Sequence, residues 1–207
     1  MAGRGNLFIV SGPSGAGKTS LLKAALQRPE CSHIRLSISH TTRSSRPGEV
    51  DGADYHFTDA GTFQRMREAG EFIESAEVFG HHYGTSRSEV ERRLEAGLTV
   101  LLEIDCQGAL QVMQQDLDSQ SVLILPPSLD VLRKRLMDRA LDRETVIERR
   151  LAGALNEIAQ YRSFTHCLVN QNFECTLEEL CQVLSGGSID PAHGRRTAEK
   201  LLASPLT

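Results

Sequence analysis

The stretch GPSGAGKTS, Gly12 to Ser20, decides the fold of this chain. The apolar run LFIV (Leu7–Val10) precedes it, and a segment with helical periodicity, Lys18–Gln27, follows it. The stretch fits the pattern G-x-x-x-x-G-K-[ST] without a mismatch. Glycines let backbone N–H groups curl around an anion, and the next helix adds its positive N-terminal end. A chance glycine-rich turn would not need both flanking elements, so the stretch predicts a phosphate-binding loop.

The loop also predicts how a nucleoside triphosphate is held. Lys18 is placed to reach the β- and γ-phosphates, and Thr19 is placed to ligand Mg²⁺. We expect the triphosphate contacts to come from Gly12, Pro13, Ser14, Gly15, Ala16, Gly17, Lys18, Thr19 and Ser20. The motif alone does not separate kinases, GTPases and motor ATPases. A GTPase fits poorly: Asp105-Cys106-Gln107-Gly108 has DxxG spacing after the VLLEI run, but the chain has no NKxD-type sequence.

Outward from the loop, strand-like apolar runs alternate with helical periods, which predicts an α/β fold with a mainly parallel sheet. We expect strands at 7–10, 34–39, 72–78, 99–104, 122–125 and 167–169, and helices at 18–27, 63–70, 88–96, from 128, 144–161 and 177–184. Ser88 and Glu91 have capping-box spacing. From Gly186 onward the sequence is polar and turn-rich, and we expect a loose tail with one helical turn.

Composition narrows the class of protein. The chain has 207 residues with 40% hydrophobic content, enough for one compact domain with a core of ordinary size. A net charge of −4 argues against broad attraction to nucleic acid or membranes. Five irregularly spaced cysteines without a CxxC pair indicate reduced thiols. The N-terminal apolar run is too short for a signal peptide, and no run reaches membrane-spanning length, so we expect a cytoplasmic protein.

Two polar clusters are candidates for a second binding site. Arg43 and Arg46 lie three residues apart in a segment rich in Ser, Thr, Gly and Pro, which suits either a bidentate phosphate clamp or a solvated basic loop. In FIESAEV, strand alternation would put Phe72, Glu74 and Ala76 on one face. A carboxylate among apolar neighbours needs partners. Glu74 could pair with an arginine, or it could accept from the N1–H and 2-amino group of guanine, which adenine lacks.

These segments, taken together, resemble the bacterial guanylate kinase family over roughly residues 5 to 185. The matching motifs are GPSGAGKTSL, SHTTRSSRPGEVDGADYHF, EFIESAEVFGHHYGTS, EIDCQG and LPPS, in the family's order and spacing. The resemblance implies phosphoryl transfer from ATP to GMP, and also dGMP, with Mg²⁺. It implies a P-loop core (1–36, 88–128 and 160–187), a small α+β GMP-binding insertion (37–87) and a helical lid (129–159), with 188–207 as a tail.

Residue by residue, the resemblance places the GMP site at Ser39, Arg43, Arg46, Glu49, Tyr55, Glu74, Tyr83, Thr85 and Asp105. The two arginines and two tyrosines would hold the GMP phosphate, and Glu74 would read guanine. Thr85 would donate towards O6, and Asp105 would also lie near the water shell of Mg²⁺. A site that hydrogen-bonds a substrate group rejects analogues lacking it by up to ~10⁴-fold, which explains a preference for GMP over AMP.

The lid implies catalytic arginines. Arg135 and Arg139 have i, i+4 spacing, and Arg150 follows; by the resemblance all three neutralise charge on the transferring group, with Lys18. Asn170 matches an adenine-side asparagine of the ATP site. Two departures stand out: Ala140-Leu141 replaces a glycine after the lid arginine, and Gln171-Asn172 replaces acidic residues. They bear on the lid hinge and on the ATP base contact.

We expect direct in-line transfer, with closure of the lid and the GMP segment excluding water. Three rivals share parts of this pattern. A ribose bisphosphate kinase would lack the guanine-reading set, a non-catalytic guanylate-kinase-like module would have a damaged phosphate loop, and an AMP or dTMP kinase would read its base differently. The partners expected are ATP and GMP, with no nucleic acid and no membrane. The sequence leaves open whether the chain forms a homo-oligomer.

Overall fold

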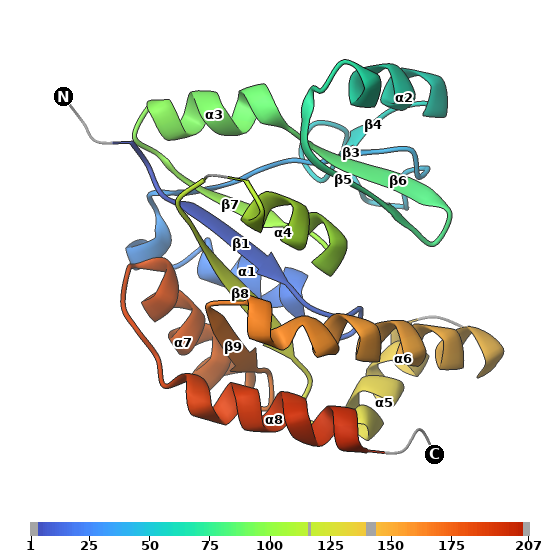
Figure 1. The fold of residues 1–207 in the computed structure, drawn as a ribbon, viewed down its shortest axis with the longest axis vertical. Helices are drawn as coiled ribbons and strands as arrows, with labels where there is room; N and C mark the ends of the chain where they lie inside the picture. The colour runs from blue at the N-terminus through green and yellow to red at the C-terminus, as the bar shows by residue number, and fades with distance from the viewer. Residues whose placement is uncertain (1–3, 116, 140–143, 205–207) are drawn as a thin grey trace. The chain divides into compact units, whose positions relative to one another are not determined.

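The structure is a computed structural model that describes residues 4–115, 117–139 and 144–204. It confirms the predicted α/β class (Figure 1). One sheet has five strands in the order β2-β7-β1-β8-β9, and a second has four in the order β4-β3-β6-β5. The β2–β7 and β8–β9 pairs are parallel, as predicted for the main sheet. The chain divides into two compact units, Met1–Leu7 with Ile34–Ser119 (unit 1) and Phe8–His33 with Gln120–Thr207 (unit 2).

Unit 1 contains the smaller sheet and the elements packed on it. Its elements are β2 (Ile34–Leu36), β3 (His40–Thr41), β4 (His56–Phe57), α2 (Ala60–Glu68), β5 (Phe72–Val78), β6 (His81–Ser86), α3 (Arg87–Glu95), β7 (Thr99–Glu103) and α4 (Cys106–Met113). The N-cap of α3 is Ser86, whose side chain accepts from the Glu89 amide. The prediction of Ser88 as the cap is therefore wrong by two positions. The strand predicted at 34–39 ends at Leu36.

The hairpin β5–β6 is the main element that the sequence did not predict as a pair. Val78 pairs with His81, so only Phe79 and Gly80 connect the strands. Both have positive φ, 52° and 79°, which is the backbone of a two-residue turn matched to the twist of a hairpin. The antiparallel ladder then runs back to Phe72 and Ser86.

A register shift in this ladder corrects the predicted strand faces. Phe72 pairs with Ser86 and Glu74 pairs with Thr85, so Ile73 is an extra residue in β5. Phe72 stacks on Phe63 of α2. Glu74 instead shares the face of Thr85, with which it is hydrogen-bonded. The prediction that Phe72 and Glu74 lie on one face is therefore wrong, because the bulge moves Phe72 to the opposite layer.

Unit 2 contains the phosphate loop. Its elements are β1 (Leu7–Ser11), α1 (Lys18–Ala25), the 3-10 turn η1 (Pro29–Cys31), β8 (Ser119–Leu125), α5 (Leu129–Arg139), α6 (Glu144–Ile158), η2 (Ala159–Ser163), β9 (His166–Val169), α7 (Phe173–Leu184) and α8 (Pro191–Ala203); the first residues of β1 and β8 belong to unit 1. The helices α1 and α7 pack together. Asn172 caps α7 by accepting from the Cys175 amide, which gives this departure from the family pattern a local structural role.

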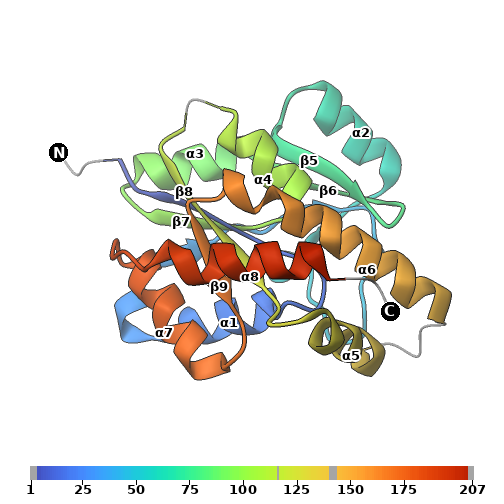
Figure 2. The same ribbon diagram turned by 60° about the horizontal axis from the view of Figure 1, so that its bottom comes forward.

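The expected loose tail is wrong, because residues 191–203 form the helix α8, which lies against β9 and α6 (Figure 2). Asp190 caps it and Pro191 begins it, a favourable start that was not recognised in the sequence. Gly194 lets the helix approach the sheet, since a Cβ there would lie 2.0 Å from the Cys167 carbonyl oxygen. Ala198 and Leu201 are buried on the same side. The largely polar sequence of α8 thus contains a short apolar stripe on one face of the helix.

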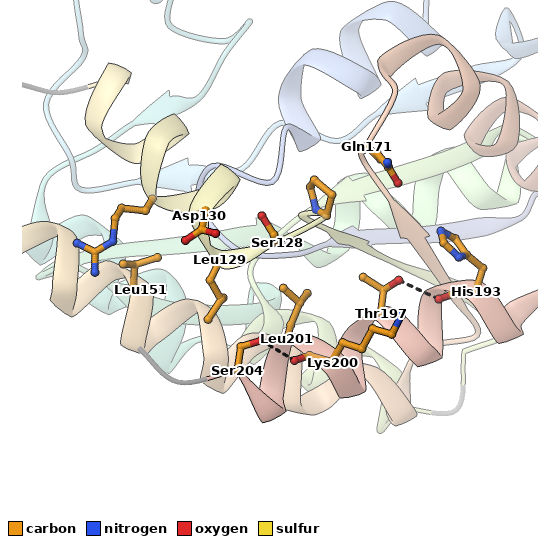
Figure 3. Close-up of a pocket in the computed structure, with 12 residues that line it drawn as sticks. Ser128, Leu129, Asp130, Leu151, Gln171, His193, Thr197, Lys200, Leu201 and Ser204 are labelled. Atoms are coloured by element: carbon orange, nitrogen blue, oxygen red, sulfur yellow. Dashed lines mark hydrogen bonds between the residues drawn. The ribbon is translucent and has the colours of Figure 1, made fainter. Parts of the chain in front are cut away.

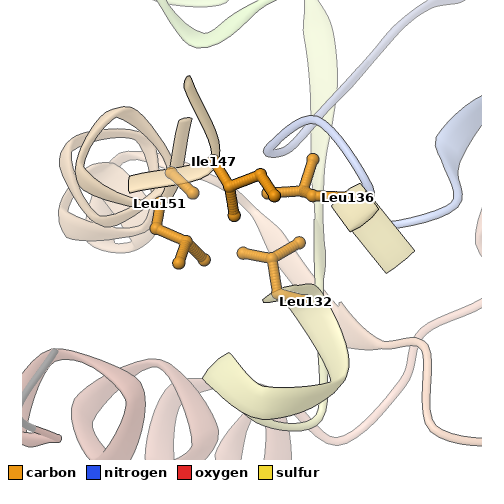
Figure 4. Close-up of a cluster of buried hydrophobic side chains, with 5 residues drawn as sticks. Leu132, Leu136, Ile147 and Leu151 are labelled. Carbon is orange, nitrogen blue, oxygen red and sulfur yellow. The ribbon is translucent and has the colours of Figure 1, made fainter. Parts of the chain in front are cut away.

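The lid helices pack through a small apolar core of their own. Its members are Leu132, Leu136, Ile147, Leu151 and Ala154, all buried (Figure 4). An ion pair of 2.6 Å between Arg133 and Glu148 also joins α5 to α6. The departure at Ala140-Leu141 lies outside the described residues. Within the described ranges, no helix combines the length and apolar character needed to span a bilayer.

Candidate active site

The phosphate loop has the conformation that its sequence predicts. Gly12, Gly15 and Gly17 all have positive φ, between 88° and 141°. At Gly12 a Cβ would lie 2.2 Å from the Ile124 carbonyl oxygen, so this position also needs glycine for space. Lys18 begins α1 and its ammonium donates to the Gly12 and Pro13 carbonyl groups. The structure therefore gathers Gly12 to Lys18 into one turn at the N-terminus of α1, where a helix favours anions.

Thr19 lies in the first turn of α1 and is exposed. A hydroxyl at this position fits Mg²⁺, which takes one or two protein oxygens and completes its octahedron with phosphate and water. Among the residues that the structure describes, no cluster of three or more His, Cys, Asp or Glu side chains could hold a metal by themselves. The role of Thr19 as a ligand of Mg²⁺ stays a prediction.

Arg135 points from α5 to the loop. Its guanidinium donates to the Asn170 carbonyl at 3.0 Å and to the Ala16 carbonyl at 3.4 Å. Arg150 is half-buried on α6 and Arg149 is exposed. The side chain of Arg139 lies outside the described part of the chain. The catalytic roles of Arg135, Arg139 and Arg150 stay predictions, although one of the three has its charge at the phosphate loop.

Asn170 follows β9 and is 4% exposed. Its side-chain nitrogen donates to the Ala16 carbonyl at 2.7 Å. The resemblance implies a place for this asparagine at the adenine of ATP, whereas the structure places its amide against the loop predicted to hold the phosphates.

The smaller sheet of unit 1 collects the residues predicted to read guanine. The Thr85 hydroxyl donates to Glu74 Oε1 at 2.6 Å, and Ser39 Oγ lies 3.2 Å from Thr85 Oγ1. Since Thr85 has one proton and directs it at Glu74, Ser39 donates to Thr85 in this array. The predicted donation from Thr85 to guanine O6 stays a prediction, because the structure uses that proton within the row.

Glu74 contributes the carboxylate of this row and is buried, with 4% exposure. Burial raises its pKa to about 7; the Thr85 hydrogen bond opposes the rise and the nearby negative charge of Asp105 adds to it. Asp105 caps α4, and its Oδ1 accepts from the Gly108 amide at 2.9 Å. A Cβ on Gly108 would lie 2.4 Å from Glu74 Oε2. The start of α4 therefore packs directly on the Glu74 carboxylate only because residue 108 has no side chain.

The predicted phosphate clamp is also assembled in unit 1. Both oxygens of Glu49 accept from one Arg43 nitrogen, at 2.8 and 2.9 Å, and Glu49 also accepts from the Arg46 amide at 2.7 Å. The bond to Arg43 lowers the pKa of Glu49, and the same bond raises the pKa of Arg43. The Arg43 guanidinium lies 5.4 Å from the ring centre of Tyr55, and the Tyr55 and Tyr83 rings are 6.0 Å apart.

Glu49 thus orients Arg43 rather than joining the basic cluster. Arg43 is only partly exposed, with 11% side-chain exposure, whereas Arg46 is exposed. Of the two interpretations that the sequence left open, the structure favours an ordered guanidinium held against a tyrosine over a freely solvated basic loop.

A separate cavity of about 430 Å³ opens in unit 2 (Figure 3). Ser128 lines it just before α5, Asp130 from α5 and Leu151 from α6, and Lys200 and Leu201 line it from α8. Among the described residues that line this cavity, none belongs to the phosphate loop. This cavity was not predicted from the sequence, because its wall depends on α8.

Comparisons with known proteins show the family of this chain. The family model described as guanylate kinase matches residues 4–186. A guanylate kinase of Alkalilimnicola ehrlichii is 48% identical over 98% of this chain and 97% of its own length. One of Alcanivorax borkumensis is 52% identical over 87% and 86%. The crystal structure of guanylate kinase from Anaplasma phagocytophilum, 32% identical, superposes with a TM-score of 0.71 over 98% of this chain and 97% of that chain. The chain belongs to the guanylate kinase family of phosphotransferases.

Proposed function

We propose that this chain transfers the γ-phosphoryl group of ATP to GMP, and also to dGMP, and that it reads guanine through Glu74. The observation that carries the proposal is the hydrogen-bonded row Ser39–Thr85–Glu74 with its buried carboxylate. Two parallel donors on guanine match the two oxygens of one carboxylate, and adenine offers neither donor. A buried acceptor left without its donors is costly, so the row rejects AMP as well as accepting GMP.

The phosphate of GMP is assigned to Arg43, with Arg46, Tyr55 and Tyr83. Arg43 supports this role because Glu49 and the Tyr55 ring already hold it in one orientation. A guanidinium ordered in advance loses little freedom when it pairs with phosphate oxygens.

The phosphates of ATP are assigned to the loop from Gly12 to Thr19. The Lys18 ammonium and the lid arginines stabilise the charge that develops on the transferring group. Mg²⁺, when bound with ATP, neutralises charge on the β- and γ-phosphates. The GMP phosphate is already anionic, so in-line attack needs no general base. Asp105 acts on guanine or through the water shell of Mg²⁺, and the enzyme works in the cytoplasm.

A coupled assay of ADP release tests the proposal with ATP and one acceptor at a time: GMP, dGMP, AMP, dTMP or ribose 1,5-bisphosphate. We expect turnover with GMP and dGMP, loss of it with EDTA and recovery with Mg²⁺. Strong turnover of another acceptor with none of GMP would overturn the assignment and favour a rival kinase. Binding of GMP without turnover of any acceptor would favour the non-catalytic module, against which the intact Gly17-Lys18-Thr19 argues.

A further inference from the structure

Asn170 is buried at the junction of three elements of unit 2. Its backbone amide donates to the Leu125 carbonyl at 2.8 Å and so extends the pairing of β8 and β9 by one residue. This backbone hydrogen bond fixes the position of the Asn170 Cα atom, from which the side chain extends. With 4% of the residue exposed, the side-chain amide must find protein partners.

The partner of the Asn170 amide is the turn of the phosphate loop itself. Its nitrogen donates to the Ala16 carbonyl at 2.7 Å, and Ala16 is fully buried. The same nitrogen lies 2.3 Å from the place where a Cβ of residue 17 would be. Gly17 therefore needs to be glycine for two reasons: its φ of 96° and the space that Asn170 occupies.

This contact sets the orientation of one peptide plane. In a trans peptide the carbonyl oxygen and the following N–H point in opposite directions. Because Asn170 holds the Ala16 carbonyl on its own side, the Gly17 N–H is directed to the other side of the loop. An N–H at this position of the motif belongs to the set that cradles the phosphates.

The lid helix contributes to the same junction. Arg135 donates to the Asn170 carbonyl at 3.0 Å and to the Ala16 carbonyl at 3.4 Å. The Ala16 carbonyl is thus approached by two donors from two elements, of which the Asn170 amide is the nearer.

We propose that Asn170 is a positioning residue for the phosphate loop, and that it favours the binding of any triphosphate rather than reading the adenine base. The proposal rests on the assignment of this loop to the phosphate donor under the proposed function. It differs from the family-based expectation of an adenine contact in one measurable respect: the base of the donor does not matter.

The test compares ATP with a probe that has no base. Inorganic tripolyphosphate is measured as a competitive inhibitor against ATP, giving its Ki beside the KM for ATP, in the wild type and in Asn170→Ala. Losing one hydrogen bond to a buried carbonyl is worth about tenfold to a hundredfold in binding. We expect the KM for ATP and the Ki of tripolyphosphate to rise by the same factor in that range, with the KM for GMP unchanged.

The matched control is Gln182→Ala. Gln182 also donates a side-chain amide to a backbone carbonyl, that of Ser188, but on the exposed surface of α7. We expect both constants to match the wild type. If Asn170→Ala does not fold, Asn170→Thr replaces it in the same comparison, because a β-branched side chain suits a strand end and is too short to reach Ala16.

Two results would overturn the proposal. A raised KM for ATP with an unchanged Ki for tripolyphosphate would mean that Asn170 contacts the base. Two unchanged constants would mean that the hydrogen bond does not matter for binding. Neither result depends on which acceptor is phosphorylated, so failure of this proposal is distinguishable from failure of the GMP assignment.

Discussion

Replacing Glu74 by glutamine should make the protein more stable at alkaline pH while removing its use of GMP. The carboxylate is 4% exposed, and burial raises its pKa from 4.5 to about 7. Between these two values the folded chain keeps a proton that the unfolded chain loses. The unfolding free energy therefore falls by up to about 1.4 kcal/mol per pH unit in that window, and above pH 7 the full loss is about 3 kcal/mol.

Glutamine at position 74 has no charge to desolvate, and it can still accept from the Thr85 hydroxyl. We expect Glu74→Gln to exceed the wild type by about 3 kcal/mol at pH 8 and by less than about 1 kcal/mol at pH 5. For a chain of this size, 3 kcal/mol corresponds to a rise of about 6–12 °C in the melting temperature. Circular dichroism melts at the two pH values measure the difference.

The matched control is Glu77→Gln, an exposed carboxylate on the same strand, which should melt like the wild type at both pH values. In the activity assay, kcat/KM for GMP should fall by about a hundredfold or more in Glu74→Gln, because the second guanine donor loses its acceptor. Equal melting of Glu74→Gln and the wild type at pH 8 would refute the reasoning, since the carboxylate would then carry no cost of burial.

Three further predictions follow from single contacts. Lys18→Met should nearly abolish turnover with an unchanged circular dichroism spectrum. Activity near that of the wild type would contradict a role of this loop in phosphoryl transfer. Gly108→Ala should raise the KM for GMP about tenfold or more but leave that for ATP unchanged, because its Cβ would lie 2.4 Å from Glu74 Oε2. Its control is Gly153→Ala on α6, where nothing lies within 4 Å, and equal effects in both would contradict a specific role. Leu201→Ala should cost about 2–4 kcal/mol in urea unfolding because Leu201 is buried in α8, whereas the exposed Leu202→Ala should cost little.

The candidate site residues could be predicted from the sequence because the conformation that each one needs depends on its immediate neighbours in the chain. Gly12, Gly17 and Lys18 need only a strand before them and a helix after them, and the structure supplies both. Glu74 was found because a carboxylate in an apolar strand needs a partner. Its actual neighbours could not be derived in the same way, because the bulge at Ile73 and the hairpin at Phe79-Gly80 depend on pairing between distant residues.

The same limit explains what was missed. The helix α4 was absent from the predicted elements, since its eight residues from Cys106 contain Gly108 and begin only two residues after β7 ends. The contact between Asn170 and Ala16 spans 154 positions and depends on how β9 pairs with β8. The helix α8 was read as a tail because its buried stripe is short and made partly of Gly194 and Ala198, which carry little hydrophobic signal.

The extra residue in β5 makes one strand serve two layers in succession. Side chains along a strand alternate between its two faces with a period of two residues, and the extra residue Ile73 shifts this alternation by one. Before the shift, Phe72 packs in the aromatic layer with Phe63 of α2. After the shift, Glu74 lies in the polar layer with Thr85 and α4. Deleting Ile73 alone, with every other residue kept, would leave Phe72 opposite Ser86 and Glu74 opposite Thr85 in a regular ladder, so both side chains would keep their present faces. The bulge thus allows two residues that lie two positions apart in the sequence to face opposite layers of the sheet.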